Sequence, residues 1–338
     1  MKAVVLQRNG SAHQAFELVE VAQPNLKNDQ VLIKVEAFGI NYADVMARQG
    51  LYKDAPPLPS ILGYEVVGEI VTSNASKLNV GERVLAFTHF GGYAEYAVAE
   101  ELACVKLSKE IPTSEALALA TQYCTAIHAF ENMASVRTGE SVLIHAASGG
   151  VGNALVDLAR NKNCYIVGTS GSEEKVQLLN RRGVNLSINY SKNDFENTIG
   201  ASNISGIDAI FDPIGGRTFR KNKKLLAQGG RLIMFGVSSF SGKKGNLIDK
   251  LSLAYSFGLM HPLEFLLRGI SIQGLNMLHL SLDKPELLNE LMMRAVALYK
   301  DGIAKPQIGW KGTVEQLAEV HDLMERRLTT GKLVVYWK

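Results

Sequence analysis

The stretch GESVLIHAASGGVG, which runs from Gly139 to Gly152, decides the fold of this chain of 338 residues. Ser141 to His145 are mostly apolar or β-branched and show no polar alternation, which is typical of a parallel strand buried on both faces. Small residues follow, and apolar residues then recur at helical spacing at Val151, Leu155, Leu158 and Ala159. The sequence therefore predicts a strand, a tight turn and a helix within an α/β sheet.

The glycines of this stretch fall where the predicted strand turns into the helix. The first N–H groups of a helix lack internal partners and its dipole favours negative charge, so this junction suits an anion. Residues 147–152 match the dinucleotide pattern G-x-G-x-x-G except for its first glycine. We expect Gly152 to let the helix pack on the strand, and a pyrophosphate to contact Ser148, Gly149, Gly150 and Val151. The alternative is a glycine-rich loop that only packs a helix onto a sheet.

The residues after the second predicted strand indicate which dinucleotide is bound. Cys164 to Gly168 form an apolar strand, which ends at Ser170, where a dinucleotide fold presents a residue to the adenosine ribose. An NAD site usually has Asp or Glu there, whereas this chain has Ser170, with Lys175 one helical turn further on. A hydroxyl and a nearby cation suit a 2′-phosphate, which a carboxylate would repel. The sequence therefore predicts NADPH as the cofactor.

Composition excludes several classes of protein. The chain is 46% hydrophobic and long enough for two domains, and its net charge of +3 comes from interspersed acids and bases, so nothing indicates a nucleic-acid partner. Its three cysteines lack C-x-x-C spacing, fit neither a disulfide framework nor a zinc cluster, and indicate a reducing cytoplasm. Met1 leads directly into a predicted strand without a signal-peptide core, and no apolar run approaches the roughly 18 residues that span a bilayer.

The chain divides by pattern into a β-rich part and an alternating α/β part. The first part has short predicted strands between turn clusters, at Lys2–Leu6, Gln30–Phe38, Glu65–Thr72 and Arg83–Phe87. A predicted helix, Glu115–Met133, leads into a doubly wound sheet of six predicted parallel strands, at 141–145, 164–169, 185–189, 207–211, 230–235 and 269–274. Three later elements are expected to return to the first domain: helices at Pro285–Lys300 and Thr313–Arg326, and a strand at Lys332–Tyr336. The predicted domains are residues 1–124 with 279–338, and residues 125–278.

A series of motifs follows in one order along the chain: residues 38–44 (FGINYAD), 49–52 (QGLY), 59–68, 81–84 (GERV), 146–152, 206–216 and 229–236. With them the whole chain resembles the medium-chain dehydrogenase/reductase superfamily, specifically its zinc-independent quinone oxidoreductase branch. Residues 41–52 and 212–216 are most similar to the vesicle amine transport protein group. The resemblance implies a β-rich GroES-like catalytic domain and a six-stranded parallel Rossmann domain that binds NADPH.

The zinc-dependent branch of that superfamily provides a contrast. Its members have a catalytic Cys where this chain has Asn41, and Gly-His-Glu where this chain has Gly63-Tyr64-Glu65. Their loop of four cysteines has no counterpart between Val84 and Ala97. A catalytic zinc needs about three N, S or O ligands from the protein, so we expect no metal.

Without a Lewis acid, hydride transfer is easiest to an acceptor that is already activated, such as a quinone or an α,β-unsaturated carbonyl. Asn41 takes the place of the zinc ligand, and its amide can donate to a carbonyl oxygen or orient the nicotinamide ribose. The resemblance implies that Tyr52 is a proton donor, as in related enoyl reductases, since a phenol with a pKa near 10 stays protonated at neutral pH. The alternative is that Tyr52 only packs against the substrate. We expect Asp44 to be a structural hydrogen-bond acceptor and Tyr64 to pack.

The resemblance also assigns residues around the cofactor. Thr125 starts the linking helix near the nicotinamide, and Tyr190, after the third strand, is similar to the family's adenosine-side tyrosine. Three residues follow the fifth strand at the carboxyl edge, where dinucleotide folds bind ligands: Phe235, Gly236 and Ser238. Arg327 is expected to reach the 2′-phosphate. The alternatives are an exposed aromatic at Tyr190 and a solvated basic face at Arg327, while His145 is most simply a buried, hydrogen-bonded core residue.

These features predict an NADPH-dependent reductase of quinones or α,β-unsaturated carbonyls. Two alternatives stay open, an enoyl thioester reductase and an NADPH-binding protein that acts at membranes or on a partner. The apolar, helical stretch Asn246–Arg268 would serve as a dimer contact, a lid or a bilayer-binding element, and its few basic residues favour the first two. The strand Gly269–Gly274 would leave an open sheet edge, so we expect a homodimer through it.

Overall fold

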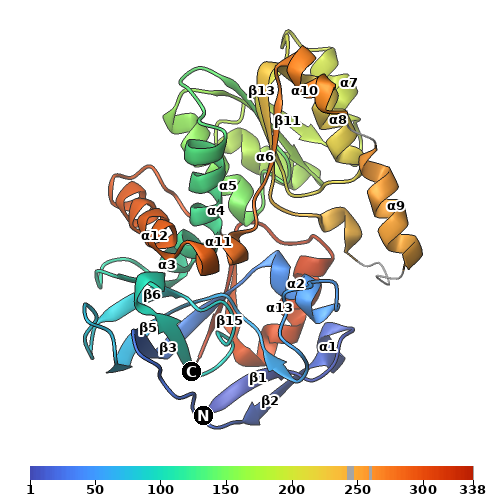
Figure 1. Ribbon diagram of the computed structural model, residues 1–338. Coiled ribbons are helices and arrows are strands. Elements are labelled where there is room, and N and C mark those ends of the chain that lie inside the picture. The colour runs from blue at the N-terminus through green and yellow to red at the C-terminus, as the bar shows by residue number, and fades with distance from the viewer. Residues whose placement is uncertain (242–246, 259–260, 338) are drawn as a thin grey trace. The chain divides into compact units, whose positions relative to one another are not determined.

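The structure is a computed structural model that describes residues 1–241, 247–258 and 261–337 (Figure 1). The chain forms two compact units. The first unit contains Met1–Cys124, Leu278–Asp301 and Pro306–Lys338, and the second contains Thr125–Met277 and Gly302–Lys305. Among the residues described, no helix has both the length and the apolar character that crossing a bilayer requires.

A six-stranded parallel sheet forms the centre of the second unit, in the order β11-β10-β9-β12-β13-β14. Its strands are β9 (Ser141–Ile144), β10 (Tyr165–Ser170), β11 (Leu186–Asn189), β12 (Ile207–Asp212), β13 (Leu226–Met234) and β14 (Ser271–Gly274). The chain starts at the central strand β9, builds outward to β11, and then continues on the other side of β9 to β14. This is the doubly wound order, so the predicted fold class is confirmed.

Helices connect the strands of this sheet: α5 (Gly150–Asn161), α6 (Glu173–Arg181), α7 (Phe195–Gly200), α8 (Arg217–Leu225), α9 (Leu247–Phe257) and α10 (Pro262–Arg268). The apolar strand residues form a core with the inner faces of α7, α8, α9 and α10, which includes Leu143, Val167, Ile210, Phe219 and Leu232. The strands β9, β10 and β12 are largely apolar and buried on both faces, so their polar side chains lie near the strand ends.

The first unit contains two sheets. One has the order β15-β16-β3-β5-β6-β8, with β7 also paired to β3, and the other has the order β2-β1-β4. The strands are β1 (Lys2–Leu6), β2 (Phe16–Glu20), β3 (Gln30–Ile40), β4 (Ser60–Ile61), β5 (Glu65–Ser73), β6 (Arg83–Phe87), β7 (Tyr96–Glu100), β8 (Cys104–Lys106), β15 (Ile308–Thr313) and β16 (Lys332–Tyr336). The helices are α1 (Ala12–Ala15), α2 (Tyr42–Arg48), α11 (Met277–Asp283), α12 (Pro285–Lys300) and α13 (Leu317–Glu325).

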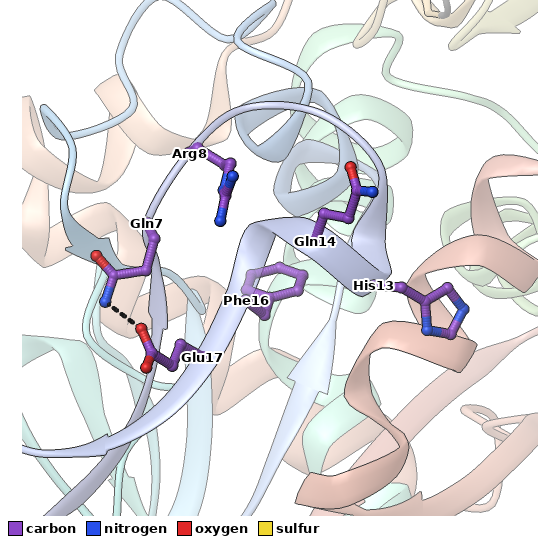
Figure 2. A pocket seen from close by; sticks show the side chains of 6 residues that line it. All are labelled: Gln7, Arg8, His13, Gln14, Phe16 and Glu17. Carbon is purple, nitrogen blue, oxygen red and sulfur yellow. Dashed lines mark hydrogen bonds between the residues drawn. The ribbon is translucent and has the colours of Figure 1, made fainter.

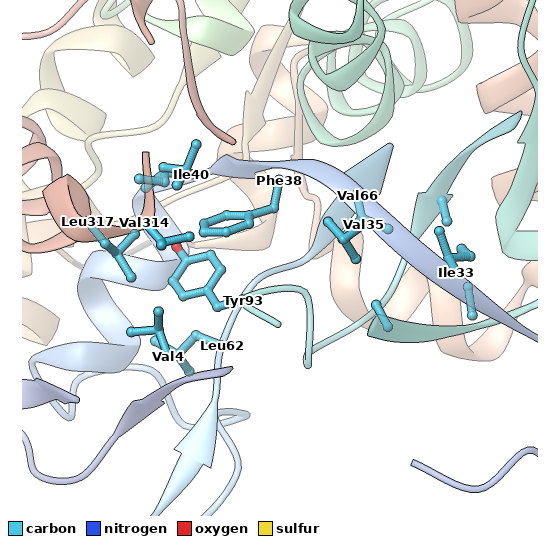
Figure 3. Packing of buried hydrophobic residues seen from close by; sticks show 14 of the residues in the cluster. Val4, Ile33, Val35, Phe38, Ile40, Leu62, Val66, Tyr93, Val314 and Leu317 are labelled. Carbon is cyan, nitrogen blue, oxygen red and sulfur yellow. The ribbon is translucent and has the colours of Figure 1, made fainter. Parts of the chain in front are cut away.

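The core of the first unit joins the two ends of the chain. The C-terminal strand β16 lies antiparallel to β3, with Val335 opposite Phe38. The Phe38 ring packs on Tyr93 with ring centroids 4.6 Å apart, and Val314 and Leu317 close the same cluster (Figure 3). The C-terminal segment therefore completes the sheet that the N-terminal part begins.

The helix predicted at Glu115–Met133 is not one regular α-helix. It begins at Thr113 and alternates between α-helical and π-helical turns: α3 (Thr113–Ala118), a π segment at Leu119–Tyr123, α4 (Cys124–Ile127) and a second π segment at His128–Met133. The backbone N–H of Thr121 donates to Glu65 Oε2 at 2.8 Å. A side-chain acceptor of this kind locally widens a helix, which periodicity in the sequence does not register. Thr125 consequently lies inside this helical run, and its prediction as a helix start is wrong.

The apolar stretch predicted at Asn246–Arg268 consists of two helices, α9 and α10. Asn246 and Leu259 lie outside the described residues. Two of its aromatic residues face the core, since Phe257 contacts the Phe219 ring and Phe265 packs in the same cluster. Other apolar side chains remain exposed to 50–81%: Leu251, Tyr255, Leu263, Leu266 and Leu267.

Candidate functional site

The glycine turn connects β9 to α5 as predicted. The turn begins at Ala146, whose φ is +50°, and the Gly149 N–H donates to the Ala146 carbonyl at 2.8 Å. Gly149 caps α5, and the helix starts at Gly150. A Cβ atom on Gly152 would lie 2.4 Å from the Ala146 carbonyl oxygen, so only glycine fits where the helix meets the strand end. The strand, turn and helix predicted from this stretch are therefore all confirmed.

The carboxyl end of β10 carries the residues predicted to face the adenosine. Ser170 is 2% exposed, and its buried hydroxyl has no hydrogen-bond partner among the residues the structure describes. Ser172 caps α6 by accepting the Lys175 backbone N–H, so Lys175 lies in the first turn of that helix. The Tyr190 N–H donates to the Ser170 carbonyl at 3.0 Å, and the Tyr190 hydroxyl would be 2.6 Å from a Cβ on Gly171. Ser170 and Tyr190 thus meet at one sheet edge, with Lys175 in the helix that follows.

The ends of β12 and β13 form a second part of the same edge. Asp212 Oδ1 accepts the N–H groups of Ile214 (2.7 Å) and Gly215 (3.0 Å), which shapes the turn after β12. The segment after β13 lies on this turn: the Phe235 N–H donates to the Asp212 carbonyl at 3.1 Å and the Ser238 N–H to the Pro213 carbonyl at 3.0 Å. These contacts hold Phe235 and Ser238, together with Gly236 between them, beside the turn after β12.

A network of buried hydrogen bonds connects the carboxyl ends of β9, β10 and β12 with α8. His145 is fully buried, and its ring nitrogens contact Thr169 Oγ1 at 3.0 Å and Asn222 Oδ1 at 2.7 Å. Asn222 Nδ2 in turn donates to Asp212 Oδ2 at 3.0 Å. Burial lowers the pKa of His145, which keeps the imidazole neutral at pH 7. The prediction of His145 as a hydrogen-bonded core residue is confirmed, while sequence reasoning missed its partners Asn222 and Asp212.

In the first unit, Asn41 caps α2 and belongs to a buried group of polar side chains. Its Nδ2 donates to Glu65 Oε1 at 2.8 Å, and Lys332 Nζ lies 3.3 Å from its Oδ1. Glu65 and Lys332 are both fully buried and form a direct ion pair. We call Asn41, Glu65 and Lys332 the Asn41 cluster. Glu65 and Lys332 fix the orientation of the Asn41 amide, and Glu65 occupies one of its two N–H groups.

One further residue, Asp44, completes the surroundings of Asn41. Asp44 is fully buried and accepts the N–H groups of Asn41 (2.8 Å) and Gly63 (3.3 Å). Burial is the main cause that raises the pKa of Asp44 to about 7. These contacts agree with the expected structural acceptor. Glu65 and Lys332 were missed as partners, although a charged residue at the start of each apolar strand, EVV and KLVV, was a visible signal.

Tyr52 and Tyr64 lie edge to face, with ring centroids 6.4 Å apart. Tyr52 is partly buried, and burial raises the pKa of its phenol above the ordinary value of 10, so it stays protonated at neutral pH. Tyr64 is buried against Phe90, and the interaction of its hydroxyl with Tyr52 lowers the pKa of the Tyr52 phenol by less than burial raises it. The expected packing role of Tyr64 is confirmed. A contact of 3.1 Å between His279 and Asp54 ties the segment after Tyr52 to α11.

The predicted site residues fall into both units. Asn41, Tyr52 and Arg327 belong to the first unit, and Arg327 is an exposed residue just beyond α13. Thr125, the glycine turn and the edge residues after β10, β11 and β13 belong to the second. Ser148 is buried within the glycine turn. In the described ranges, no three His, Cys, Asp or Glu side chains gather as metal ligands would.

A surface hollow of about 530 Å³ lies elsewhere, at the β1–α1–β2 corner of the first unit (Figure 2). It is lined by Gln7, Arg8, His13, Gln14, Phe16 and Glu17. Gln7 Nε2 donates to Glu17 Oε2 at 2.9 Å across it. None of the predicted site residues lines this hollow, and five of its six lining residues are exposed, so it does not form part of the candidate site.

Comparison with known proteins agrees with this geometry. Residues 27–109 match the alcohol dehydrogenase GroES-like domain, and residues 150–293 match the family described as zinc-binding dehydrogenase. The synaptic vesicle membrane protein VAT-1 homolog of Danio rerio is 30% identical over 99% of this chain and 69% of its own length. The quinone oxidoreductase of Homo sapiens is 32% identical over 94% of this chain and 92% of its own length. A mycobacterial protein solved in complex with NADPH has the same fold, with a TM-score of 0.86 at 23% identity over the full length of both chains.

A doubly wound sheet with a glycine turn at its central strand, together with a GroES-like unit, defines a protein of the dehydrogenase/reductase class. The chain belongs to the medium-chain dehydrogenase/reductase superfamily, in the branch that contains the quinone oxidoreductases and the VAT-1 homologs. The family predicted from the motifs is confirmed.

Proposed function

We propose that this protein is an NADPH-dependent reductase that transfers hydride to quinones or α,β-unsaturated carbonyls without a zinc ion. The Asn41 cluster carries the proposal. A neutral amide, oriented by a buried ion pair, stands where zinc-dependent relatives have a thiolate ligand, and it suits a carbonyl oxygen better than a metal. The human relative at 32% identity is named a quinone oxidoreductase, which supports this class of acceptor.

The side chains of the first unit would divide the work on the acceptor. When bound, NADPH supplies the hydride. The second N–H of Asn41 would donate to the acceptor oxygen as negative charge develops on it, and the fixed amide needs no reorganisation for this. The Tyr52 hydroxyl would supply a proton, because its raised pKa keeps it protonated.

The residues of the second unit fit the proposed cofactor. The glycine turn offers the first N–H groups of α5 to a pyrophosphate, and the buried Ser170 hydroxyl has capacity for a hydrogen bond that no described residue uses. The proposed contacts from this unit are Thr125, Ser148, Gly149, Gly150, Val151, Ser170, Lys175, Tyr190, Phe235, Gly236 and Ser238. Asn41 and Arg327 would contribute from the first unit.

Oxidation of NADPH by a panel of quinones and enones, with a chelator present, tests the proposed function. Activity with at least one acceptor that survives chelation is expected. If no acceptor is reduced, or if chelation abolishes activity, the proposal fails. A long enoyl thioester that is reduced faster than every quinone would favour the alternative of an enoyl thioester reductase. We also propose a cytoplasmic protein, because its three cysteines are buried and unpaired.

Cofactor preference gives a quantitative test. NADPH is expected to bind at least about tenfold more tightly than NADH, since a charge-assisted phosphate contact contributes about 1.5–3 kcal/mol. Lys175→Ala should weaken NADPH and leave NADH nearly unchanged, and Ser170→Asp should shift the preference towards NADH. The dissociation constants at low and high salt measure this, and the preference should decrease as salt rises. Lys162→Ala is the control, because Lys162 follows the end of α5 that is remote from the glycine turn. Equal weakening of NADPH and NADH binding by Lys175→Ala would disprove the assignment of the 2′-phosphate site.

We further propose a homodimer through β14. Among the residues that the structure describes, this strand pairs only with β13, which leaves its other edge open, and α10 directly before it exposes Leu266 and Leu267. Pairing of two β14 strands across a twofold axis would extend the sheet and cover these leucines. Sedimentation at micromolar concentration should show a dimer, and Leu266→Glu with Leu267→Glu should dissociate it. A wild-type monomer would contradict the proposal, and liposome flotation would then test the remaining membrane alternative for this stretch.

A further inference from the structure

Asn153 has an unusual place in the glycine turn. It lies in the first turn of α5 and is 3% exposed, although asparagine is a poor helix former because its side chain competes for backbone hydrogen bonds. Its side-chain amide makes such bonds here: Nδ2 lies 2.9 Å from the Ser148 carbonyl oxygen and 2.9 Å from that of Gly149. The side chain therefore binds the turn that precedes its own helix.

These bonds bear on whether the turn presents carbonyl oxygens or N–H groups to a ligand. The Ala146 carbonyl accepts the Gly149 N–H, and the carbonyls of Ser148 and Gly149 accept the Asn153 amide. Carbonyl oxygens repel a pyrophosphate, whereas the N–H groups at the start of a helix attract it. Each carbonyl that bonds to the protein is held away from a ligand, which leaves the N–H groups at the start of α5 to face it.

The turn also has a reason to need this support. Ala146 has a φ of +50°, a conformation that residues other than glycine rarely adopt, and the pattern lacks its first glycine at Ala147. Asn153 Oδ1 is buried and has no partner in the described part of the chain, so this side chain carries an unsatisfied acceptor. A leucine, which branches at the same atom, would avoid that cost, which indicates that the two donated bonds are what the position requires.

We infer that Asn153 is a positioning residue, which holds the glycine turn in the conformation that binds the pyrophosphate of the dinucleotide. The inference rests on the proposed NADPH site. It adds a residue outside the glycine pattern, which acts through Ser148 and Gly149 rather than by touching the cofactor.

Direct binding measurements test the inference without relying on turnover. Asn153→Leu should raise the dissociation constant for NADPH, followed by its fluorescence, about five- to tenfold. The same variant should leave unchanged the affinity for adenosine 2′-monophosphate, which lacks the pyrophosphate. Asn153→Ser should give an intermediate value, because a hydroxyl can still reach the carbonyl one turn earlier. Asn161→Leu, at the exposed end of the same helix, is the matched control and should change neither affinity.

A second substitution distinguishes positioning from packing. Ala146→Gly removes the backbone strain at φ +50° and should restore at least about threefold of the NADPH affinity lost in Asn153→Leu. Unchanged NADPH affinity in Asn153→Leu, or equal weakening of adenosine 2′-monophosphate, would overturn the inference. The measurement is of binding and not of turnover. If the protein binds NADPH but reduces no acceptor, the proposed function is refuted, while the effect of Asn153 on NADPH affinity can still be measured. Should the leucine variant not fold, the serine variant and its Ala146→Gly combination decide the question.

Discussion

Replacement of Lys332 by methionine is expected to lower the free energy of unfolding by about 3–5 kcal/mol. Lys332 and Glu65 are both fully buried and paired, and removal of one partner leaves the other charge buried without compensation. Replacing both residues, as Lys332→Met with Glu65→Gln, removes both charges and should recover most of the lost stability. Denaturant unfolding of the two single variants and the double variant gives the coupling between them.

An exposed pair provides the control for this experiment. Lys106 contacts Glu82 at 2.6 Å, but its side chain is 51% exposed. Lys106→Met should therefore change stability by no more than about 1 kcal/mol. The double variant should stay slow as a reductase although it is stable, because Lys332 no longer holds Asn41 Oδ1 and a neutral amide at position 65 is a weaker acceptor than a carboxylate for Asn41 Nδ2. A double variant as unstable as the single ones would show that the cost comes from lost packing, not from charge.

The elements that sequence patterns predicted best are those whose signal is local. The strands β9, β10 and β12 are largely continuous apolar runs, the bounds of α12 match the predicted Pro285–Lys300, and the glycine turn follows from small residues between a strand and a helix. Each of these signals comes from residues that are close together in the sequence. Their order in the doubly wound sheet follows from general rules of chain connection.

The features that were missed depend on contacts between distant parts of the chain. Lys332 meets Asn41 only because β16 pairs with β3, with Leu333 opposite Ile40, and no local pattern fixes that register. The π-helical segment Leu119–Tyr123 contains Thr121, whose backbone N–H donates to a carboxylate from β5. Asn153 looks like an ordinary polar residue until the turn it binds is seen in three dimensions. For these residues, chemistry is set by tertiary neighbours, so composition and spacing do not reveal it.

Replacement of Tyr52 by phenylalanine should separate the two classes of acceptor. The hydride adduct of an α,β-unsaturated carbonyl needs a proton, and a positioned acid contributes about 10²–10⁴ in rate. Tyr52→Phe is therefore expected to lower kcat/KM for an enone by at least about 10². Quinone reduction should change by no more than about threefold, because water can protonate a hydroquinone. Steady-state rates with one enone and one quinone measure the difference.

The role of Tyr52 as an acid is also tested by the pH dependence of enone reduction and by the variant Tyr64→Phe. The acid must be protonated to act, and burial raises the pKa of Tyr52 above 10, so the wild-type enone rate should stay level from pH 6 to about 9 and fall only above 10. Tyr64→Phe removes a hydroxyl whose interaction with Tyr52 lowers the pKa of the Tyr52 phenol, so it should leave both reactions unchanged at pH 7 and move the fall of the enone rate to higher pH. If Tyr52→Phe slowed quinone and enone alike, the ring would be a packing surface for the substrate. If it slowed neither, the proton would come from water, and Asn41 would remain as the group that stabilises charge on the acceptor.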